Sequence, residues 1–333
     1  MTTCVTSSAV GVSLLLLLSV TCQTGFACSE VGLPLAESNR TRQLPVVLWH
    51  GMGDSCCNTH SIGAVRNRIH HLLGGVFVHS IATGEGGPAD SESSIFGNVN
   101  AQVEDVCKTL ASFPELKDGY NAVGFSQGGQ FMRAVVERCQ HTGPKVHTLV
   151  TLGGQHQGVM NVPKCWNPSF NVTPSYMCSL SQRFLGWGAN LPLIRTHLVQ
   201  AQYFKEPRNL ASYRAHNIFL ADINNDRDTK NPLYKDNLST LEKFVMFRFE
   251  HDTTVVPRDS AWFAWYNGTQ LLTMNQTDLY QEDWIGMRAL HEAGKLEFRG
   301  CPGDHMHFNL EWFEDNIVEP YLRAPAVTNL PRS

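Results

Sequence analysis

The run Gly124-Phe125-Ser126-Gln127-Gly128 constrains this chain more than any other stretch, because it sets a serine between glycines at a strand-to-helix junction. Apolar residues 120–123 before it predict a short buried strand, and the pattern of residues 130–138 after it predicts a helix. Glycines on both sides of the serine permit the sharp turn of a nucleophile elbow. Ser126 is therefore the predicted nucleophile, and the backbone N–H of Gln127 is a predicted oxyanion donor.

Strand-like and helical segments alternate through the first half of the chain. Apolar runs at residues 44–49, 75–81 and 146–152 predict strands, and residues 99–110 carry apolar side chains at helical spacing. This order predicts an α/β protein, the α/β-hydrolase fold, with a mostly parallel sheet and helices on both faces.

The alternation stops after residue 158 and resumes with a strand at residues 243–249. Residues 28–157 and 242–333 are therefore predicted to form the hydrolase core. Residues 158–241, which are rich in Pro, Asn, Trp and Tyr, are predicted to form a largely helical insertion before the strand that carries the catalytic acid.

Two aspartates are candidates for the acid, since this fold places acid and histidine after the serine in chain order. Asp252 follows the strand at residues 243–249, and apolar residues in the next loop would anchor its turn. Asp222 follows a strand-like run at residues 217–221 and precedes a polar stretch, 224–226, that has the composition of a surface turn. Asp252 is favoured, although either side chain could supply the orienting carboxylate.

Two of the 14 histidines, His305 and His307, stand where the chain order requires the base, before a final helix predicted near Glu311. His305 directly follows the turn residues Gly303 and Asp304 and is the predicted general base. His307 lies two residues farther on and would point elsewhere. The two histidines and Asp304 could also ligate zinc, but no Cys or His partners at metal spacing accompany them, so no metal site is predicted.

The run Trp49-His50-Gly51-Met52-Gly53 ends the first predicted strand with a glycine turn. Such a turn can direct a backbone N–H at the catalytic centre, which makes Met52 the predicted second oxyanion donor beside Gln127. The alternative is that the two glycines only close a tight turn after the strand, and the neighbouring elbow favours the functional interpretation.

Three features indicate the secretory pathway. An apolar run at residues 9–20 predicts a signal peptide over residues 1–27. Because no Lys or Arg precedes the run, a signal anchor is an open alternative. The chain carries 10 cysteines, and removal of the leader would leave an even number, which predicts disulfides without fixing their pairing. Five sequons are glycosylation candidates: Asn39, Asn171, Asn237, Asn267 and Asn275.

The rest of the chain has an ordinary globular composition, with 42% hydrophobic residues. No stretch after the leader is long and apolar enough to cross a bilayer, so no stable membrane insertion is predicted. The net charge of -4 gives no reason to expect a nucleic-acid partner.

These segments together resemble the lysosomal palmitoyl-protein thioesterases over about residues 44–322. The resemblance is carried by five stretches, namely residues 49–58 (WHGMGDSCCN), 119–131 (GYNAVGFSQGGQF), 153–158 (GGQHQG), 218–224 (IFLADIN) and 303–305 (GDH). It implies Ser126 as nucleophile, Asp252 as acid and His305 as base. It also implies that Met52 and Gln127 form the oxyanion hole.

The resemblance further implies three disulfides, which are Cys107–Cys139, Cys165–Cys178 and, between neighbouring residues, Cys56–Cys57. Neighbouring Cα atoms lie closer than the usual disulfide span, so geometry alone would not suggest the last of these. Cys28 and Cys301 have no counterpart in the family pattern. A bridge between these two residues and a pair of unrelated thiols are both open.

The activity that the resemblance implies is removal of long-chain acyl groups from protein cysteines, with release of a fatty acid and without a cofactor. The implied partners are S-acylated proteins or peptides, together with a glycan-dependent sorting receptor on the route to the lysosome. The acyl groove is expected between the carboxyl edge of the sheet and the insertion. Two alternatives stay open: a neutral lipase or carboxylesterase with the same triad, and a catalytically silent lipid-binding protein, against which the complete triad argues.

Overall fold

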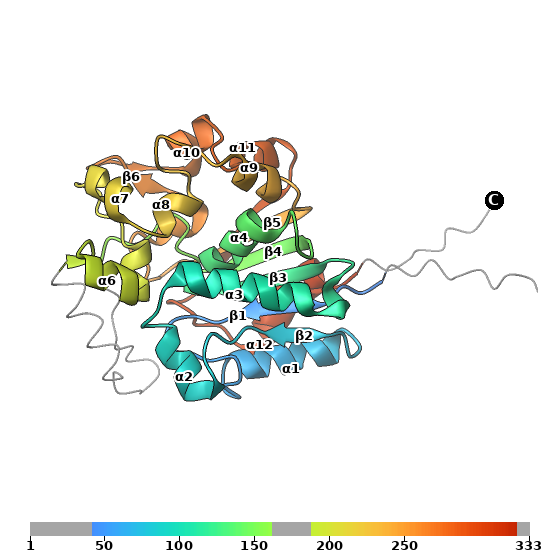
Figure 1. The fold of residues 1–333 in the computed structure, drawn as a ribbon. Helices are drawn as coiled ribbons and strands as arrows, with labels where there is room; N and C mark the ends of the chain where they lie inside the picture. The colour runs from blue at the N-terminus through green and yellow to red at the C-terminus, as the bar shows by residue number, and fades with distance from the viewer. Residues whose placement is uncertain (1–41, 162–187, 325–333) are drawn as a thin grey trace, which may run out of the picture. The chain divides into compact units, whose positions relative to one another are not determined.

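A six-stranded sheet forms the centre of the computed structural model, which describes residues 42–161 and 188–324 (Figure 1). The strands stand in the order β2-β1-β3-β4-β5-β8 and comprise β1 (Val46–Trp49), β2 (Val78–Ser80), β3 (Tyr120–Phe125), β4 (Val146–Leu152), β5 (Lys243–Phe249) and β8 (Leu296–Cys301). Each neighbouring pair is parallel. All carboxyl ends therefore meet at one edge, where open α/β sheets place their sites, and the predicted fold class is confirmed.

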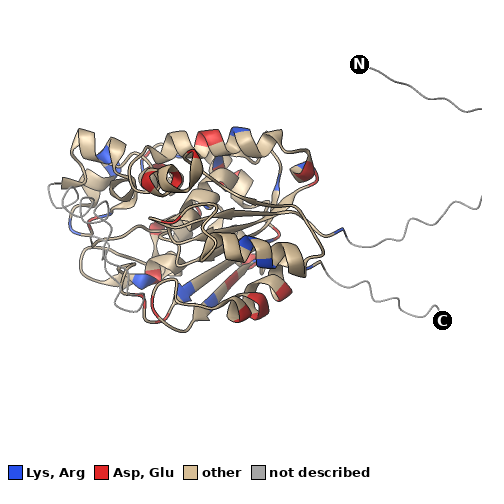
Figure 2. Ribbon diagram, turned by 90° about the horizontal axis from the view of Figure 1, so that it is seen from below, with Lys and Arg blue, Asp and Glu red and all other residues tan. Residues whose placement is uncertain are grey.

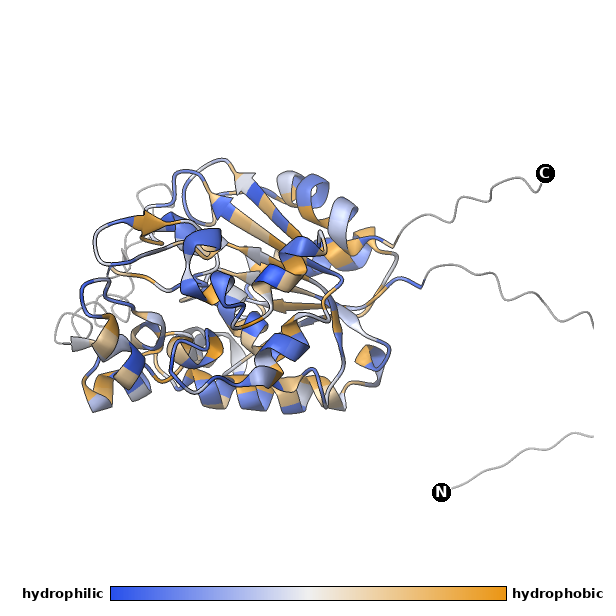
Figure 3. Ribbon diagram, turned by 90° about the horizontal axis from the view of Figure 1, so that it is seen from above, coloured by the Kyte–Doolittle hydropathy of each residue, from blue (hydrophilic) through white to orange (hydrophobic). Residues whose placement is uncertain are grey.

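Helices cover both faces of this sheet, as its apolar strands require. In β1, Val47 and Trp49 pack in one core with α3 (Val99–Ser112) and α4 (Gln127–Cys139). The alternate residues Val46 and Leu48 pack in a second core with α1 (Ile62–Leu72), α12 (Leu310–Phe313) and the π-helical segment Glu314–Leu322. Strands buried on both faces need apolar residues at every position. The covering helices are banded by hydropathy, as amphipathic helices are (Figure 3).

Most predicted elements occur where the sequence placed them, but the strand predicted at residues 217–221 is wrong. The chain there turns into the short helix α8 (Leu220–Ile223). The side-chain oxygen of Asn217 accepts hydrogen bonds from the backbone N–H groups of Phe219 and Ala221, at 3.1 Å each. Such local side-chain bonds satisfy the first N–H groups of a helix, and they outweighed the strand preference of the apolar run.

The elements described between β4 and β5 are helical. They are α6 (Pro192–His197), a 3₁₀ turn (Val199–Tyr203), α7 (Leu210–His216), α8 and α9 (Pro232–Leu238). Residues 162–187 of the predicted insertion lie outside the described residues. Two strands of two residues each, β6 (Trp265–Tyr266) and β7 (Leu271–Leu272), follow β5, and the helices α10 (Asp278–Gln281) and α11 (Met287–Glu292) come next. In the first half of the chain, the helix α2 (Gly86–Ser93) precedes α3.

A buried polar network joins α4 to the helical region. Arg133 and Glu137 on α4 are fully buried, and Arg133 Nη1 lies 2.7 Å from Glu137 Oε1. Arg133 Nη2 donates to Asn224 Oδ1 at 2.7 Å. The prediction of a surface turn at residues 224–226 is therefore wrong. These residues are at most 8% exposed, because their polar groups bond to partners inside the protein.

Removing one member of the Arg133–Glu137 pair should destabilise the protein strongly. Burial raises the pKa of Glu137 to about 7, and Arg133 opposes this rise. Arg133→Met would leave the carboxylate unpaired, so we expect the free energy of unfolding at pH 7 to fall by about 3–5 kcal/mol. Because a protonated Glu137 carries no charge, the loss should shrink as the pH falls below its pKa. Chemical denaturation at pH 5 and pH 8 measures the loss of free energy of unfolding and its dependence on pH.

The matched control is Arg42→Met, since Arg42 pairs with Asp118 through a side chain that is 68% exposed. Exposed pairs contribute about 0–1 kcal/mol, so this variant should unfold nearly as the parent does. Equal effects of the two substitutions would contradict the importance of the buried pair.

The cysteines that can be described form two bridges and one thiol. Cys107 on α3 is joined to Cys139 at the end of α4, with Cα atoms 6.1 Å apart, and Cys56 is joined to Cys57. Cys301 is a buried free thiol, which gives no support to a bridge with Cys28. Cys28, Cys165 and Cys178 lie outside the described residues.

The sequons differ in exposure. Asn267 and Asn275 are exposed, whereas Asn39 and Asn171 lie outside the described residues. Asn237 is only 5% exposed, and its Nδ2 atom, where a glycan would attach, donates to the Glu137 carbonyl at 2.8 Å. The prediction of a glycan at Asn237 is therefore corrected, because α9 buries this side chain against α4.

Charged residues of both signs are interspersed along the ribbon (Figure 2). Across residues 42–161 and 188–324, none of the helices combines the length and the apolar character needed to cross a bilayer. Within the same ranges, His, Cys, Asp and Glu side chains do not gather in any group of three or more that could hold a metal ion.

Candidate active site

Ser126 lies at the turn between β3 and α4 with a positive φ, which non-glycine residues rarely adopt, at φ 52° and ψ -124°. The two glycines of the motif are required by close packing. A Cβ atom on Gly124 would run into the carbonyl oxygen of Gly128, and one on Gly128 would run into that of Trp49. The strained turn places the serine side chain at the carboxyl edge of the sheet, as a nucleophile elbow does.

The three residues predicted as a triad meet at this edge. His305 Nε2 lies 2.8 Å from Ser126 Oγ, and His305 Nδ1 lies 2.7 Å from Asp252 Oδ2. Ser126 follows β3, Asp252 follows β5 and His305 follows β8, so three strand ends bring together residues that are 53 and 179 positions apart. The histidine side chain is 10% exposed and that of the aspartate 2%, which shields their hydrogen bond from water.

The carboxylate of Asp252 is held by its own loop. Its Oδ1 atom accepts hydrogen bonds from the backbone N–H groups of Thr254, at 2.9 Å, and Val255, at 2.8 Å. These bonds leave Oδ2 to face His305. A carboxylate fixed in this way can orient the imidazole and stabilise its cation.

Asp304 joins the loop of the acid to the loop of the base, a role that the sequence did not predict. Its Oδ1 atom accepts from the backbone N–H groups of Thr253, at 2.9 Å, and His305, at 2.7 Å. Burial opposes its charge, but these hydrogen bonds prevail and lower the pKa of Asp304. The only sign of this role in the sequence was the position of Asp304 immediately before the predicted base, and that position suggested a zinc ligand instead.

The other candidate acid, Asp222, has different partners. Its Oδ2 atom lies 2.7 Å from Arg138 Nη2 and accepts a hydrogen bond from Tyr234 at 2.7 Å. Its side chain is 33% exposed on α8 and makes these contacts with α4 and α9. Asp252, and not Asp222, is thus the aspartate that contacts His305.

The loop after β1 reaches the elbow at Gly51. A Cβ atom added to Gly51 would lie 3.1 Å from Ser126 Cβ, so only a residue without a side chain fits there comfortably. Gln127 is the first residue of α4, where backbone N–H groups have no partner within the helix. Its side chain is tied away from the serine, donating to the Ser94 carbonyl at 2.8 Å and accepting from Tyr203 at 3.0 Å.

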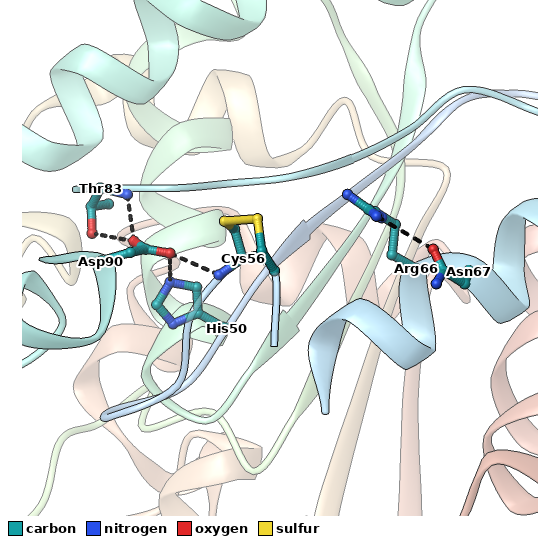
Figure 4. Close-up of a disulfide and its surroundings, with 7 residues drawn as sticks. His50, Cys56, Arg66, Asn67, Thr83 and Asp90 are labelled. Atoms are coloured by element: carbon teal, nitrogen blue, oxygen red, sulfur yellow. Dashed lines mark hydrogen bonds and ion pairs between the residues drawn. A yellow bond between two sulfur atoms is a disulfide. The ribbon is translucent and has the colours of Figure 1, made fainter. Parts of the chain in front are cut away.

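A buried ion pair stands behind this loop (Figure 4). His50 Nδ1 donates to the Gly51 carbonyl at 2.9 Å, and its Nε2 atom lies 3.2 Å from Asp90 Oδ2. Asp90 also accepts from the backbone N–H groups of Cys56 and Thr83, at 2.7 Å each. The carboxylate therefore connects the loop after β1, with its Cys56–Cys57 bridge, to α2.

The pair should stabilise the protein most in acid. Burial opposes both charges, but each residue's partner prevails, so the pKa of His50 rises above 6.5 and that of Asp90 falls below 3.8. The contribution of His50 to the free energy of unfolding is then complete below pH 6.5, and it is lost as the pH rises through the pKa of His50 in the folded protein. That of Asp90 is complete above pH 3.8 and is lost as the pH falls through its folded pKa. Both contributions are present between these two values.

Asp90→Asn is accordingly expected to lower the Tm more at pH 5 than at pH 8, because His50 loses its partner while it is charged. Thermal unfolding at the two pH values measures this difference. Asp118→Asn, which alters a carboxylate that is 49% exposed beside Arg42, is the control. A Tm loss for Asp90→Asn that is the same at both pH values would contradict the coupling of the two charges.

The sheet, the elbow and the hydrogen-bonded serine, histidine and aspartate define an α/β hydrolase. The family model described as palmitoyl protein thioesterase matches residues 45–305. Palmitoyl-protein thioesterase 1 of Caenorhabditis elegans is 43% identical to this chain, over 85% of the chain and 93% of the relative. Palmitoyl-protein thioesterase 3 of Dictyostelium discoideum is 30% identical, over 88% of the chain and 96% of the relative. The chain belongs to the palmitoyl-protein thioesterase family and is a thioester hydrolase.

Solved structures are similar at lower identity. Est1E of Butyrivibrio proteoclasticus with bound ferulic acid is 12% identical, with a TM-score of 0.42 over 85% of this chain and 90% of that one. RedJ with a polyethylene glycol molecule in its active site is 13% identical, with a TM-score of 0.40 over 80% of this chain and 83% of that one.

Proposed function

We propose that this thioesterase removes palmitoyl groups from protein cysteines with Ser126 as nucleophile, His305 as general base and Asp252 as the residue that orients the base. The observation that supports this assignment most is the continuous hydrogen-bonded row from Ser126 Oγ through His305 to Asp252, with distances of 2.8 Å and 2.7 Å. The membership of this chain in the palmitoyl-protein thioesterase family supports an acylated protein as substrate and a fatty acid as product.

The first half-reaction makes an acyl-enzyme. The Ser126 hydroxyl oxygen attacks the thioester carbonyl while its proton passes to His305 Nε2. The carbonyl electron pair moves onto oxygen, where the backbone N–H groups of Met52 and Gln127 would stabilise it. When the carbonyl re-forms, the carbon–sulfur bond breaks and its electrons leave with the cysteine thiolate. The thiolate takes the proton from His305 Nε2 as it departs, which returns the base to its neutral form. In the second half-reaction water attacks the acyl carbonyl while His305 takes a proton from the water. The bond between the acyl carbon and Ser126 Oγ then breaks, this proton passes to Oγ, and the fatty acid is released.

The acyl chain would lie along an apolar cluster near the loop after β1. The cluster consists of Ile95, Ala189, Ile194, Leu198 and Ala201, and Met52, Phe96 and Phe204 pack against it. Met52 directly follows Gly51, which lies against Ser126. An acyl carbonyl at the serine could therefore direct its hydrocarbon tail onto the side chains of this cluster, most of which come from the proposed insertion, residues 158–241.

The proposed location is the lysosome, reached through the secretory pathway after cleavage of a leader at residues 1–27. Glycans at the exposed residues Asn267 and Asn275 would be read by a sorting receptor, and Asn39 and Asn171 are further candidates. The His50–Asp90 pair suits this location because its charges stabilise the fold in the acidic range. Glycopeptide mapping of the secreted protein tests the assignment, with Asn237 expected to carry no glycan.

Parallel rates on a palmitoyl thioester and the matching palmitoyl oxygen ester test the proposed substrate class. A thiolate leaves more readily than an alkoxide, so the thioester should have the higher kcat/KM on the same acyl chain. A preference for the oxygen ester would favour the lipase or carboxylesterase alternative. Binding of both compounds without turnover would favour the lipid-binding alternative.

A further inference from the structure

Gln155, which is not in the predicted triad or oxyanion hole, contacts the nucleophile. It lies in the loop after β4, the strand that pairs with β3 and so ends beside the elbow. Its side-chain Nε2 atom lies 3.1 Å from Ser126 Oγ and 3.1 Å from the Gly153 carbonyl oxygen. The residue is only 3% exposed, so water does not compete strongly for these contacts.

The orientation of this amide is dictated by Gln130, a fully buried residue in the first turn of α4. The backbone N–H of Gln155 can only donate, so the atom of Gln130 that it meets at 2.8 Å must be the oxygen, Oε1. The amide nitrogen of Gln130 then donates to Gln155 Oε1, also at 2.8 Å. Only the amide nitrogen of Gln155 is left to face the Gly153 carbonyl and Ser126.

The direction of the serine proton follows from this arrangement. Ser126 Oγ accepts a hydrogen bond from Gln155, and its own hydrogen is free to point at His305 Nε2, 2.8 Å away. The hydroxyl is thus ready to lose its proton to the base. The same N–H dipole would stabilise negative charge on Oγ as the proton leaves, and again when Oγ departs from the acyl carbon in the second half-reaction.

We propose that Gln155 is a further catalytic residue, which donates a hydrogen bond to the nucleophilic oxygen, and that Gln130 is the positioning residue that holds it. This proposal rests on the proposed function of Ser126. It differs from the role of Met52 and Gln127, which concerns the oxygen of the substrate. Because Oγ takes part in both half-reactions, losing the donor should slow acylation and deacylation alike, for thioesters and for oxygen esters.

Gln155→Glu is the sharpest test, because it keeps the shape of the side chain and can still accept from Gln130. As a carboxylate it can only accept hydrogen bonds, so kcat at pH 7 should fall about 10- to 100-fold, with little change in KM. Once protonated it can donate again. The ratio of parent to variant kcat should therefore shrink as the pH is lowered from 8 to 5, because burial raises the pKa of a carboxyl group. A packing role alone would not produce this trend.

The other titratable and charged groups around the amide are common to both proteins. Asp252 and His305 lie on the side of the serine. Arg133 and His156 lie on the other side, where Arg133 Nη2 donates to the His156 carbonyl at 3.4 Å. Burial keeps the pKa of His156 well below its usual value.

Gln202→Glu is the matched control. Gln202 is also fully buried, and it accepts from the Val99 N–H at 2.8 Å and donates to the Gly97 carbonyl at 2.7 Å. It therefore loses a comparable donor at a position away from Ser126, and its kcat should stay near that of the parent. Gln155→Leu, which cannot donate at any pH, should show a loss that does not recover in acid.

Labelling of Ser126 by a fluorophosphonate probe gives a second measurement on folded protein, and the labelling rate should fall with kcat in Gln155→Glu. A kcat and labelling rate within twofold of the parent at pH 7, or a loss that is constant from pH 5 to pH 8, would overturn the proposal. Failure of the underlying function is distinguishable, because Ser126→Ala would then retain activity. An inactive Ser126→Ala beside a normal Gln155→Glu would reject the role of Gln155 alone.

Discussion

Ser126→Ala is expected to lower kcat for palmitoyl-thioester hydrolysis by on the order of 10⁴-fold or more, with the fold intact. The substitution removes the one atom that would form the acyl-enzyme bond, and the oxyanion donors alone cannot replace it. Because the glycines on either side fix the turn, the alanine meets the same backbone strain as the serine. Steady-state rates with a palmitoyl thioester, together with the Tm, measure both expectations.

Ser80→Ala is the matched control for this result. Ser80 lies at the end of β2 and, like Ser126, is 8% exposed, so the two substitutions remove the same atom from equally buried sites. Ser80→Ala should keep near-parental activity. An active Ser126→Ala would remove the proposed nucleophile from the mechanism.

Asp252→Asn is expected to lower kcat by on the order of 10³- to 10⁴-fold. An amide nitrogen facing His305 Nδ1 would favour the imidazole tautomer that carries its hydrogen on Nε2, and that tautomer cannot accept the proton of Ser126. The amide would also stabilise the imidazolium less than the carboxylate does. The pH profile of kcat and single-turnover rates test whether the loss lies in the chemical steps.

Asp222→Asn supplies the comparison, because Asp222 was the competing candidate in the sequence. It contacts Arg138, Arg227 and Tyr234, so we expect an effect on stability and little effect on the kcat of the folded protein. The reverse outcome, with Asp222→Asn inactive and Asp252→Asn active, would transfer the role of the acid to Asp222.

The sequence predicted those parts of the protein that depend on local pattern and chain order. Largely apolar runs predicted β4 and β5 at the bounds that the structure shows, since strands covered on both faces have few polar positions. The glycines around Ser126 indicated the elbow because the turn excludes any side chain there. The order of serine, acid and histidine then indicated Asp252 and His305, which the structure brings together with Ser126.

The features that the sequence did not predict depend on contacts between distant segments. Asn224 looked like a surface residue because its partners, Arg133 and the His156 carbonyl, lie 91 and 68 positions away. Gln155 carries no local signal for its contact with Ser126, since a glutamine in a glycine-rich loop is equally typical of a turn. Both side chains are buried in the folded protein, where contacts with distant segments fix their positions.

The most direct test of the central claim is rapid quenching of the enzyme with a palmitoyl thioester, followed by peptide mass spectrometry. The mechanism predicts a transient palmitoyl ester on the peptide that contains Ser126, which forms before the fatty acid appears and decays at the rate of turnover. Asp252→Asn should form it more slowly, and Ser126→Ala should not form it. Turnover without acyl transfer to Ser126, or with the acyl group on another residue, would contradict the account.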